Sequence, residues 1–292
     1  ESRKLLSGKC IAHGVNVLLW SLDIFIKKTN LFSKEIKIDF IKPSNVGENI
    51  TLHWIKNKNA LNIKSKTEII IIIKFGSLSE KCSYLKNKNV IFKKQTSEKP
   101  LVKDINNLKI EQVFKSFFSG SDKNFKFFFP SLVNKVGNNI VYEIVNLSSM
   151  VGMQVPGLNS ILSSLKINFD HDDNKNIRLK INNIDKRFKL IDLIYIGANI
   201  QTNIKAFFRN PPITLPQSKT IKINTKKNFS YKKKILIIGG TRGLGAWTAK
   251  LSALMGADVS ITYNVGKNDA KLIQSDIKSI GGICKIYKLE IK

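Results

Sequence analysis

The sequence predicts an α+β unit followed by the start of an α/β unit with a doubly wound parallel sheet. Two observations predict this fold class. Within the first 210 residues, an apolar segment of helical length followed by strand-like runs occurs twice, which is typical of a sheet that wraps a helix. After these repeats, a short apolar run, a glycine-rich turn and a helical pattern follow one another, as at the first crossover of a parallel sheet.

The first repeat begins with a predicted helix over residues 14–28. Its apolar residues recur on one face, at Val15, Leu18, Leu19, Leu22, Phe25 and Ile26, and this spacing indicates a helix with one buried side. Four strand-like runs follow, at residues 35–41, 49–56, 61–66 and 68–75. The pattern predicts one long helix wrapped by a meander of strands.

The second repeat starts after residues 78–112, which are polar, lysine-rich and typical of a connection. A helix is predicted over residues 138–154, and four strands are predicted at 159–170, 176–184, 189–196 and 199–209. The two helices begin about 125 residues apart, so the pattern indicates a pseudo-repeat.

The last region follows a predicted linker, and its pattern predicts strands that alternate with helices. Strands are expected at 234–238, 257–263 and 283–290, with helices at 246–255 and 269–280. This order predicts a parallel sheet with right-handed crossovers. The expected organisation is a first unit at 1–77, a connection at 78–112, a second unit at 113–210, a linker at 211–231 and the α/β region at 232–292.

Composition narrows the class of protein. The net charge of +28 comes mostly from lysines spread along the sequence, whereas nucleic-acid-binding proteins concentrate Arg, Lys and aromatic residues on one face. We therefore expect no nucleic-acid partner, and the charge suits phosphate-bearing substrates or an acidic carrier protein. The three cysteines lack zinc-site spacing, which predicts no metal site and a reducing, cytoplasmic location. No apolar run reaches the ~18–20 residues of a membrane span.

The turn Gly239-x-x-x-Gly243-x-Gly245 resembles the signature of the short-chain dehydrogenase/reductase family, with Ile238 where that family usually has Thr. The resemblance implies a Rossmann fold in which glycines let the backbone approach a pyrophosphate at a helix N-terminus. The residues expected to bind the cofactor are Gly239, Thr241, Arg242, Gly243, Leu244, Gly245, Tyr263, Asn264 and Glu290.

The expected cofactor is NADP(H) rather than NAD(H). Tyr263-Asn264 stands at the end of the second predicted strand, where a carboxylate would bind the ribose of NAD. Arg242 can pair with a 2′-phosphate, or it can be a solvated loop cation. The pair Tyr263 and Lys267 mimics the spacing of the family's catalytic Tyr and Lys but brackets a loop, so we interpret it as coincidence. In the family, the catalytic Ser, Tyr and Lys lie in the later half of the fold.

The segment Ile11-Ala12-His13-Gly14, together with Lys42-Pro43 and Gly47-Glu48, resembles the hot-dog fold of MaoC-like enoyl-thioester hydratases and dehydratases. The resemblance implies a double hot dog, reversible loss of water from an (R)-3-hydroxyacyl thioester, and an acyl thioester of coenzyme A or acyl carrier protein as partner. The Gly14 N–H would bind the thioester carbonyl. His13 is either catalytic or a structural residue at the start of the helix. We expect the full-length protein to be a homo-oligomer.

Under the leading hypothesis, the chain is part of a bifunctional enzyme in which a dehydratase/hydratase is fused to an NADP(H)-dependent 3-oxoacyl reductase. We expect the main catalytic residues of both halves to lie outside this sequence, in a longer protein truncated here at both ends. The alternatives are a non-catalytic acyl-chain binding module with a degenerate nucleotide-binding domain, and a charge-driven binder of nucleic acid or membrane surfaces.

Three further features receive a structural interpretation. We expect His53 to be a surface residue and His171-Asp172-Asp173 to form a hairpin turn rather than a metal site. The cluster Phe125, Phe127, Phe128 and Phe129 is interpreted as core or as the lining of an acyl tunnel.

Overall fold

Two units make up the chain in the computed structural model, which describes residues 11–82, 100–115, 125–169, 177–209, 215–221 and 233–290. The first unit comprises the described residues up to 209, and the second comprises those from 215 onward. Each unit is described by itself below. The predicted turn at residues 171–173 lies outside the described residues.

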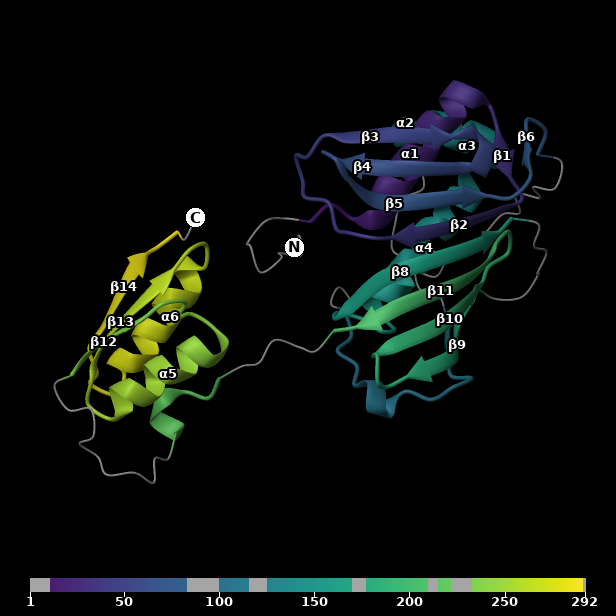
Figure 1. Ribbon diagram of the computed structural model, residues 1–292. Coiled ribbons are helices and arrows are strands. Elements are labelled where there is room, and N and C mark those ends of the chain that lie inside the picture. Colours follow the sequence, from purple (N-terminus) through teal and green to yellow (C-terminus); the bar gives the residue numbers. More distant parts are fainter. Residues whose placement is uncertain are drawn as a thin grey trace. The chain divides into compact units, whose positions relative to one another are not determined.

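The first unit contains two copies of a helix followed by four strands (Figure 1). The first copy consists of α1 (Gly14–Thr29), β2 (Glu35–Phe40), β3 (Ile50–Ile55), β4 (Ala60–Ser65) and β5 (Glu68–Phe75). The second consists of α4 (Asn138–Met153), β8 (Ser160–Asn168), β9 (Arg178–Asp185), β10 (Leu190–Ile196) and β11 (Gln201–Phe208). All ten elements begin and end within two residues of the predicted limits, because the hydrophobic periodicity that predicts them is local.

The strand order confirms the predicted pseudo-repeat. Within the described residues, nine strands form one sheet in the order β3-β4-β5-β2-β8-β11-β10-β9-β7, where β7 is Val113–Lys115. Apart from β7, the second half mirrors the first. The two halves meet where β2 and β8 pair antiparallel, with Ile38 opposite Leu165. The first unit is therefore an α+β fold in which one continuous antiparallel sheet packs against the two helices α1 and α4.

The core of the first unit lies between the sheet and the helices that it curves around (Figure 1). All six apolar positions predicted on the first helix are buried on α1. Hydrogen bonds join this helix to α3 (Pro130–Val136). The Asp23 carboxylate accepts a hydrogen bond from the Leu132 N–H at 2.8 Å, and the Lys135 ammonium donates to the Asn30 carbonyl at the other end of α1 at 2.6 Å. These bonds satisfy polar groups at helix ends.

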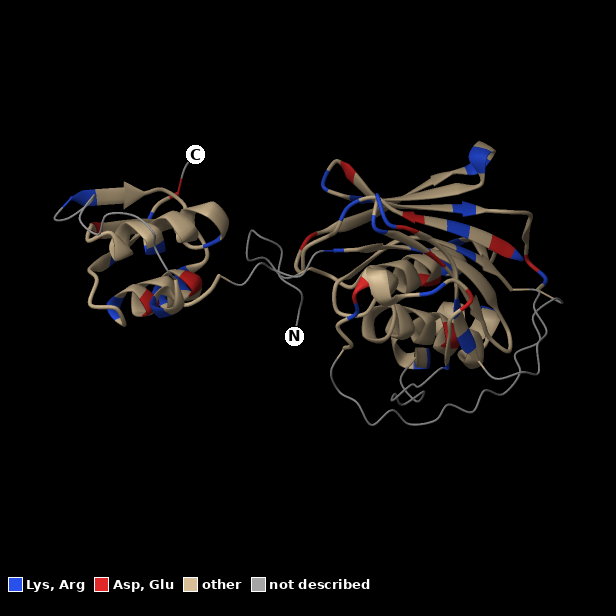
Figure 2. Cartoon of the chain, turned by 90° about the horizontal axis from the view of Figure 1, so that it is seen from below, with Lys and Arg blue, Asp and Glu red and all other residues tan. Residues whose placement is uncertain are grey.

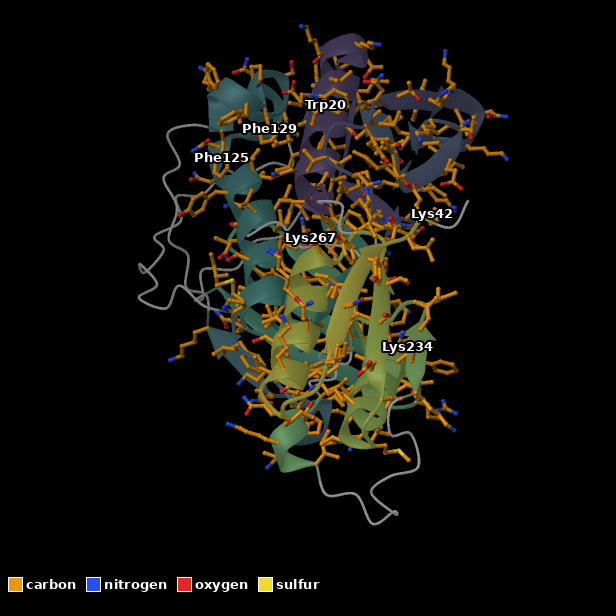
Figure 3. The ribbon with its side chains drawn as sticks, turned by 90° about the vertical axis from the view of Figure 1, so that its left-hand side faces the viewer. Trp20, Lys42, Phe125, Phe129, Lys234 and Lys267 are labelled. Atoms are coloured by element: carbon orange, nitrogen blue, oxygen red, sulfur yellow. The ribbon has the colours of Figure 1, made fainter. Side chains whose placement is uncertain are left out.

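The structure corrects one expectation about the phenylalanine cluster on α2 (Phe125–Phe128) and just after it. Phe125 and Phe129 pack against the core (Figure 3). Phe127 and Phe128 are instead 82% and 60% exposed, so they line neither core nor tunnel. A short helix can bury only one face, and consecutive aromatic residues cannot all lie on it. His53 is exposed on β3, as expected.

The predicted connection at 78–112 contains structured segments as well. Its first residues form β6 (Leu78–Ser79), which pairs with β1 (Phe32–Ser33) in a separate two-stranded sheet. Later come a 3₁₀ turn, η2 (Ile105–Asn107), and a bridge between Val102 and Gly157.

The second unit is a parallel sheet with two helices on one face (Figure 1). Its elements are β12 (Lys234–Ile237), α5 (Gly243–Leu254), β13 (Asp258–Tyr263), α6 (Lys267–Lys278) and β14 (Cys284–Lys288). The strands lie in the order β12-β13-β14, and all pairings are parallel. Small residues such as Ala246, Ala249 and Ala270 are fully buried and let the helices approach the sheet closely. This arrangement agrees with the predicted α/β order.

Within the predicted linker, residues 215–221 pack on the second unit. Leu215 contacts its apolar core. The Lys250 ammonium of α5 donates to the Pro216 carbonyl at 2.8 Å and lies 2.9 Å from the Asp276 carboxylate of α6. That carboxylate also accepts a hydrogen bond of 2.6 Å from the Ser218 hydroxyl. A buried ion pair thus holds this segment against both helices.

Charged residues are distributed over both units. Among the described residues, both basic and acidic residues lie scattered over the elements of each unit (Figure 2). No described helix is both long enough and apolar enough to cross a membrane.

Candidate functional site

The glycine-rich turn connects β12 to α5, and its glycines leave backbone atoms without side chains to cover them. Gly239 and Gly243 have φ angles of +76° and +52°, which residues with a Cβ rarely adopt, and a Cβ on either would meet open space. Gly240 and Gly245 are glycines for a different reason. A Cβ on Gly240 would lie 2.6 Å from the Ile261 side chain, and one on Gly245 would lie 2.4 Å from the Gly239 carbonyl oxygen. The loop thus turns tightly at two glycines and packs closely at the other two.

The amino end of α5 is suited to bind an anion. Among the described residues, none accepts a hydrogen bond from the backbone N–H of Gly243, Leu244 or Gly245. The Gly239 N–H donates to the Thr262 hydroxyl at 3.0 Å, which ties the loop to β13. Exposed N–H groups at a positive helix end, with open space over Gly239 and Gly243, fit a pyrophosphate.

Arg242 immediately precedes α5 and forms an ion pair that its sequence position did not reveal. Its Nε and one Nη donate to the same Asp269 carboxylate oxygen at 2.8 and 2.5 Å. The two side chains are 56% and 33% exposed, so the pair lies at the surface. Arg242 is therefore not a cation surrounded only by solvent.

The other residues expected at the cofactor site lie at the carboxyl ends of the strands. Tyr263 is half-buried at the end of β13, and its carbonyl accepts a hydrogen bond from the Leu289 N–H at 2.8 Å. Asn264 is exposed, and Glu290 is exposed just beyond β14. Lys267 is the first residue of α6 (Figure 3). Tyr263 thus ends a strand while Lys267 begins a helix, and a loop separates the two residues.

Sequence reasoning missed three residues of this site. Gly240 follows the predicted Gly239, and the Gly-Gly pair in the sequence could have pointed to it. Thr262 lies on β13 and Asp269 lies on α6, both further along the chain. Only their contacts with the loop reveal them, because no spacing rule links a strand residue or a helix residue to a turn this distant in sequence.

His13 and Gly14 stand at the start of α1. The His13 carbonyl accepts hydrogen bonds from the Asn16 and Val17 N–H groups at 2.9 and 3.2 Å. Its ring Nε2 lies 3.4 Å from the Ser148 hydroxyl of α4. The first helix therefore begins beside the second copy's helix. His13 is exposed, and its backbone carbonyl closes the first turn of α1.

The absence of a side chain at Gly14 lets the Phe40 ring pack closely against the start of α1. A Cβ there would lie 3.1 Å from the Phe40 ring. Among the described residues, none accepts a hydrogen bond from the Gly14 N–H, as expected for the first residue of a helix. This N–H remains available to a carbonyl oxygen.

Glu48, in the segment that resembles the MaoC-like pattern, holds the loop before β3. Its carboxylate accepts hydrogen bonds from the Asn45 N–H at 3.1 Å, the Asn45 amide at 2.6 Å and the Ser65 hydroxyl at 2.8 Å. These bonds, led by the Asn45 side chain, lower the pKa of Glu48 to about 2. The residue therefore acts as a loop anchor.

A buried carboxyl group on α4 was not predicted. Glu143 is fully buried and accepts hydrogen bonds from the Asn199 N–H at 3.0 Å, the Asn199 amide at 2.7 Å and the Ile200 N–H at 3.3 Å. Burial raises its pKa to about 7 despite these bonds. A Cβ on Gly197 would lie 1.8 Å from its carboxylate, so glycine is required there. Glu143 thus fastens the β10–β11 turn to the helix.

Comparisons with known proteins give distant likenesses. Neither the protein-family models nor the curated proteins contain a match. A dehydrogenase/reductase from Sinorhizobium meliloti is 33% identical over 22% of this chain, with a TM-score of 0.21. The peroxisomal multifunctional enzyme type 2 from Drosophila melanogaster is 6% identical over 67% of the chain, with a TM-score of 0.36. An acyl-ACP thioesterase from Bacteroides thetaiotaomicron is 10% identical over 70% of it, with a TM-score of 0.31.

The chain spans only part of two of these proteins. It covers 25% of the reductase and 40% of the multifunctional enzyme, but 95% of the thioesterase. With TM-scores this low, the likenesses carry no argument about the fold, which rests on the strand order and register of the chain itself.

Proposed function

We propose that this chain is part of a bifunctional acyl-thioester enzyme. Its double hot-dog unit would serve an (R)-3-hydroxyacyl-thioester dehydratase or enoyl hydratase, and its second unit would serve an NADP(H)-dependent 3-oxoacyl reductase. The observation that carries the proposal is the presence on one chain of a mirrored double hot-dog sheet and a βα glycine loop open to an anion. The two reactions are chemically linked, because reduction of a 3-oxoacyl thioester yields the 3-hydroxyacyl thioester that the other half dehydrates.

In the second unit, the chain's own residues bind and orient the dinucleotide. The N–H groups of Gly243, Leu244 and Gly245 bind the pyrophosphate, and Arg242 binds the 2′-phosphate. Thr241, Tyr263, Asn264 and Glu290 are proposed to line the site around the adenosine, since they lie in the loop or at the ends of β13 and β14. When bound, NADPH supplies a hydride to a carbonyl carbon.

Titration calorimetry of the full chain with NADPH and NADH tests this site. Gly243→Asp should lower the affinity for both at least about tenfold, because it places a carboxylate beside the pyrophosphate. Gly281→Asp is the matched control: Gly281 has a φ of +81° and open space around its Cβ position, but lies in the turn before β14, at the opposite end of the sheet. Equal losses in the two variants would reject the site. Arg242→Ala should weaken NADPH more than NADH.

In the first unit, we propose that the Gly14 N–H donates to the thioester carbonyl, while His13 lies beside it. Such a bond would stabilise the enolate oxygen that develops when the α-proton leaves. The partner is an acyl thioester of coenzyme A or of an acidic carrier protein, and the net charge of +28 favours its approach. The full-length protein is proposed to be a homo-oligomer.

Amide NMR spectra recorded with crotonyl-coenzyme A test this contact. The Gly14 cross-peak should shift on binding, whereas that of Asn138, the first residue of the mirrored helix α4, should not. Equal shifts at both helices would reject the assignment. Binding that leaves the Gly14 cross-peak in place would favour a non-catalytic acyl-chain binding module.

A further inference from the structure

We infer that Asp269 sets the cofactor selectivity of the glycine loop by holding the Arg242 guanidinium and lowering its affinity for a 2′-phosphate. The inference rests on the proposed dinucleotide site. Asp269 does not need to touch the cofactor, and it lies on α6, outside the glycine motif. The physical basis is competition between two anions for one cation.

The contact geometry defines which part of Arg242 is engaged. Nε and one Nη donate to the same Asp269 oxygen at 2.8 and 2.5 Å, so the carboxylate occupies one edge of the planar guanidinium. The edge formed by the two Nη groups keeps donors for a second anion. A phosphate bound there would lie only about 6 Å from the carboxylate, at which distance like charges repel measurably.

The position of Asp269 is fixed by its surroundings. It lies in the first turn of α6, next to Ala270, which is fully buried. A Cβ on Gly266 would lie 3.0 Å from the Asp269 carboxylate, so the glycine leaves space for the carboxylate beside the backbone. The Asp269 carboxylate thus holds its negative charge beside Arg242. Since both side chains are partly exposed, the pair opposes the phosphate without excluding it.

The test compares Asp269→Asn with the wild-type full chain. Asparagine keeps an oxygen that can accept from Arg242 but removes the charge. At low salt, we expect the ratio of NADPH to NADH affinity to rise about three- to tenfold, from repulsion between the carboxylate and a doubly charged phosphate at about 6 Å. Adenosine 2′,5′-bisphosphate should gain affinity over AMP by a similar factor. The gain should shrink between about 0.01 M and about 1 M salt, because salt screens exposed charges.

Asp258→Asn is the matched control. Asp258 begins β13, at the opposite end from Tyr263 and about 16 Å along the strand, so its loss should leave the ratio unchanged. An unchanged or reduced ratio of NADPH to NADH affinity in Asp269→Asn would overturn the inference. A reduced ratio would mean that Asp269 instead helps Arg242 to bind the phosphate. If the wild-type chain binds neither NADH nor NADPH, the proposed site fails and the inference fails with it. If both bind and only the ratio stays constant, the inference alone fails.

Discussion

Burial of Glu143 predicts that the first unit loses stability as the pH rises towards neutrality. Its pKa is raised from 4.5 to about 7 in the fold, while the unfolded chain keeps the ordinary value. Between these values the folded state binds more protons than the unfolded state, so the free energy of unfolding falls with rising pH. The stabilising effect is complete below pH 4.5 and is lost as the pH rises through about 7.

The size of the effect follows from the shift. Each pKa unit corresponds to about 1.4 kcal/mol, so the full loss is about 3 kcal/mol. Between about pH 5 and about pH 8 the loss is about 2–3 kcal/mol. Glu143→Gln should remove this dependence, since glutamine has no ionisable group but retains an oxygen for the Asn199 N–H. The amide also brings an NH₂ group towards backbone donors, which lowers stability equally at every pH.

Urea unfolding followed by tryptophan fluorescence measures the difference. Of the three tryptophans, Trp20 and Trp54 lie in the first unit, so both proteins carry Trp247→Phe. The Trp54 ring centroid is 4.9 Å from that of Phe25 in the core, which makes it a reporter of packing. Between about pH 5 and about pH 8, the free energy of unfolding of the Glu143→Gln protein should rise by about 2–3 kcal/mol relative to that of its parent. Parallel pH profiles for the two proteins would refute the reasoning.

Three further substitutions probe individual contacts. Asp23→Ala leaves the buried Leu132 N–H without its acceptor and should lower the free energy of urea unfolding by about 1–3 kcal/mol; a cost near zero would mean that water replaces the carboxylate. Lys250→Met leaves the Asp276 carboxylate without its cation and should cost about 3 kcal/mol in the unfolding of the second unit, measured by calorimetry. Gly245→Ala places a Cβ 2.4 Å from a backbone carbonyl oxygen. It should reduce NADPH affinity at least about tenfold with an unchanged far-UV circular dichroism spectrum, and wild-type affinity would contradict the packing described for the loop.

Most of the secondary structure followed from local patterns. The apolar spacing of α1 and α4 and the alternation along the strands predicted their limits, because burial of one face imposes a period on the residues themselves. The glycine turn was predictable for the same reason, since positive φ angles and close backbone contact select glycine at particular positions. The pseudo-repeat was visible as the recurrence of one pattern.

The sequence by itself determined the longer helices and strands, their order and the chemical character of the glycine loop. Only the tertiary structure decided which elements pair and which side chains meet. The pairing of β2 with β8, the contact of His13 with Ser148 and the ion pair of Arg242 with Asp269 all join segments that are far apart along the chain. The exposure of Phe127 and the burial of Glu143 likewise depend on neighbours from other elements. Such contacts leave no local periodicity, because the free energy that selects them arises when distant surfaces are buried together.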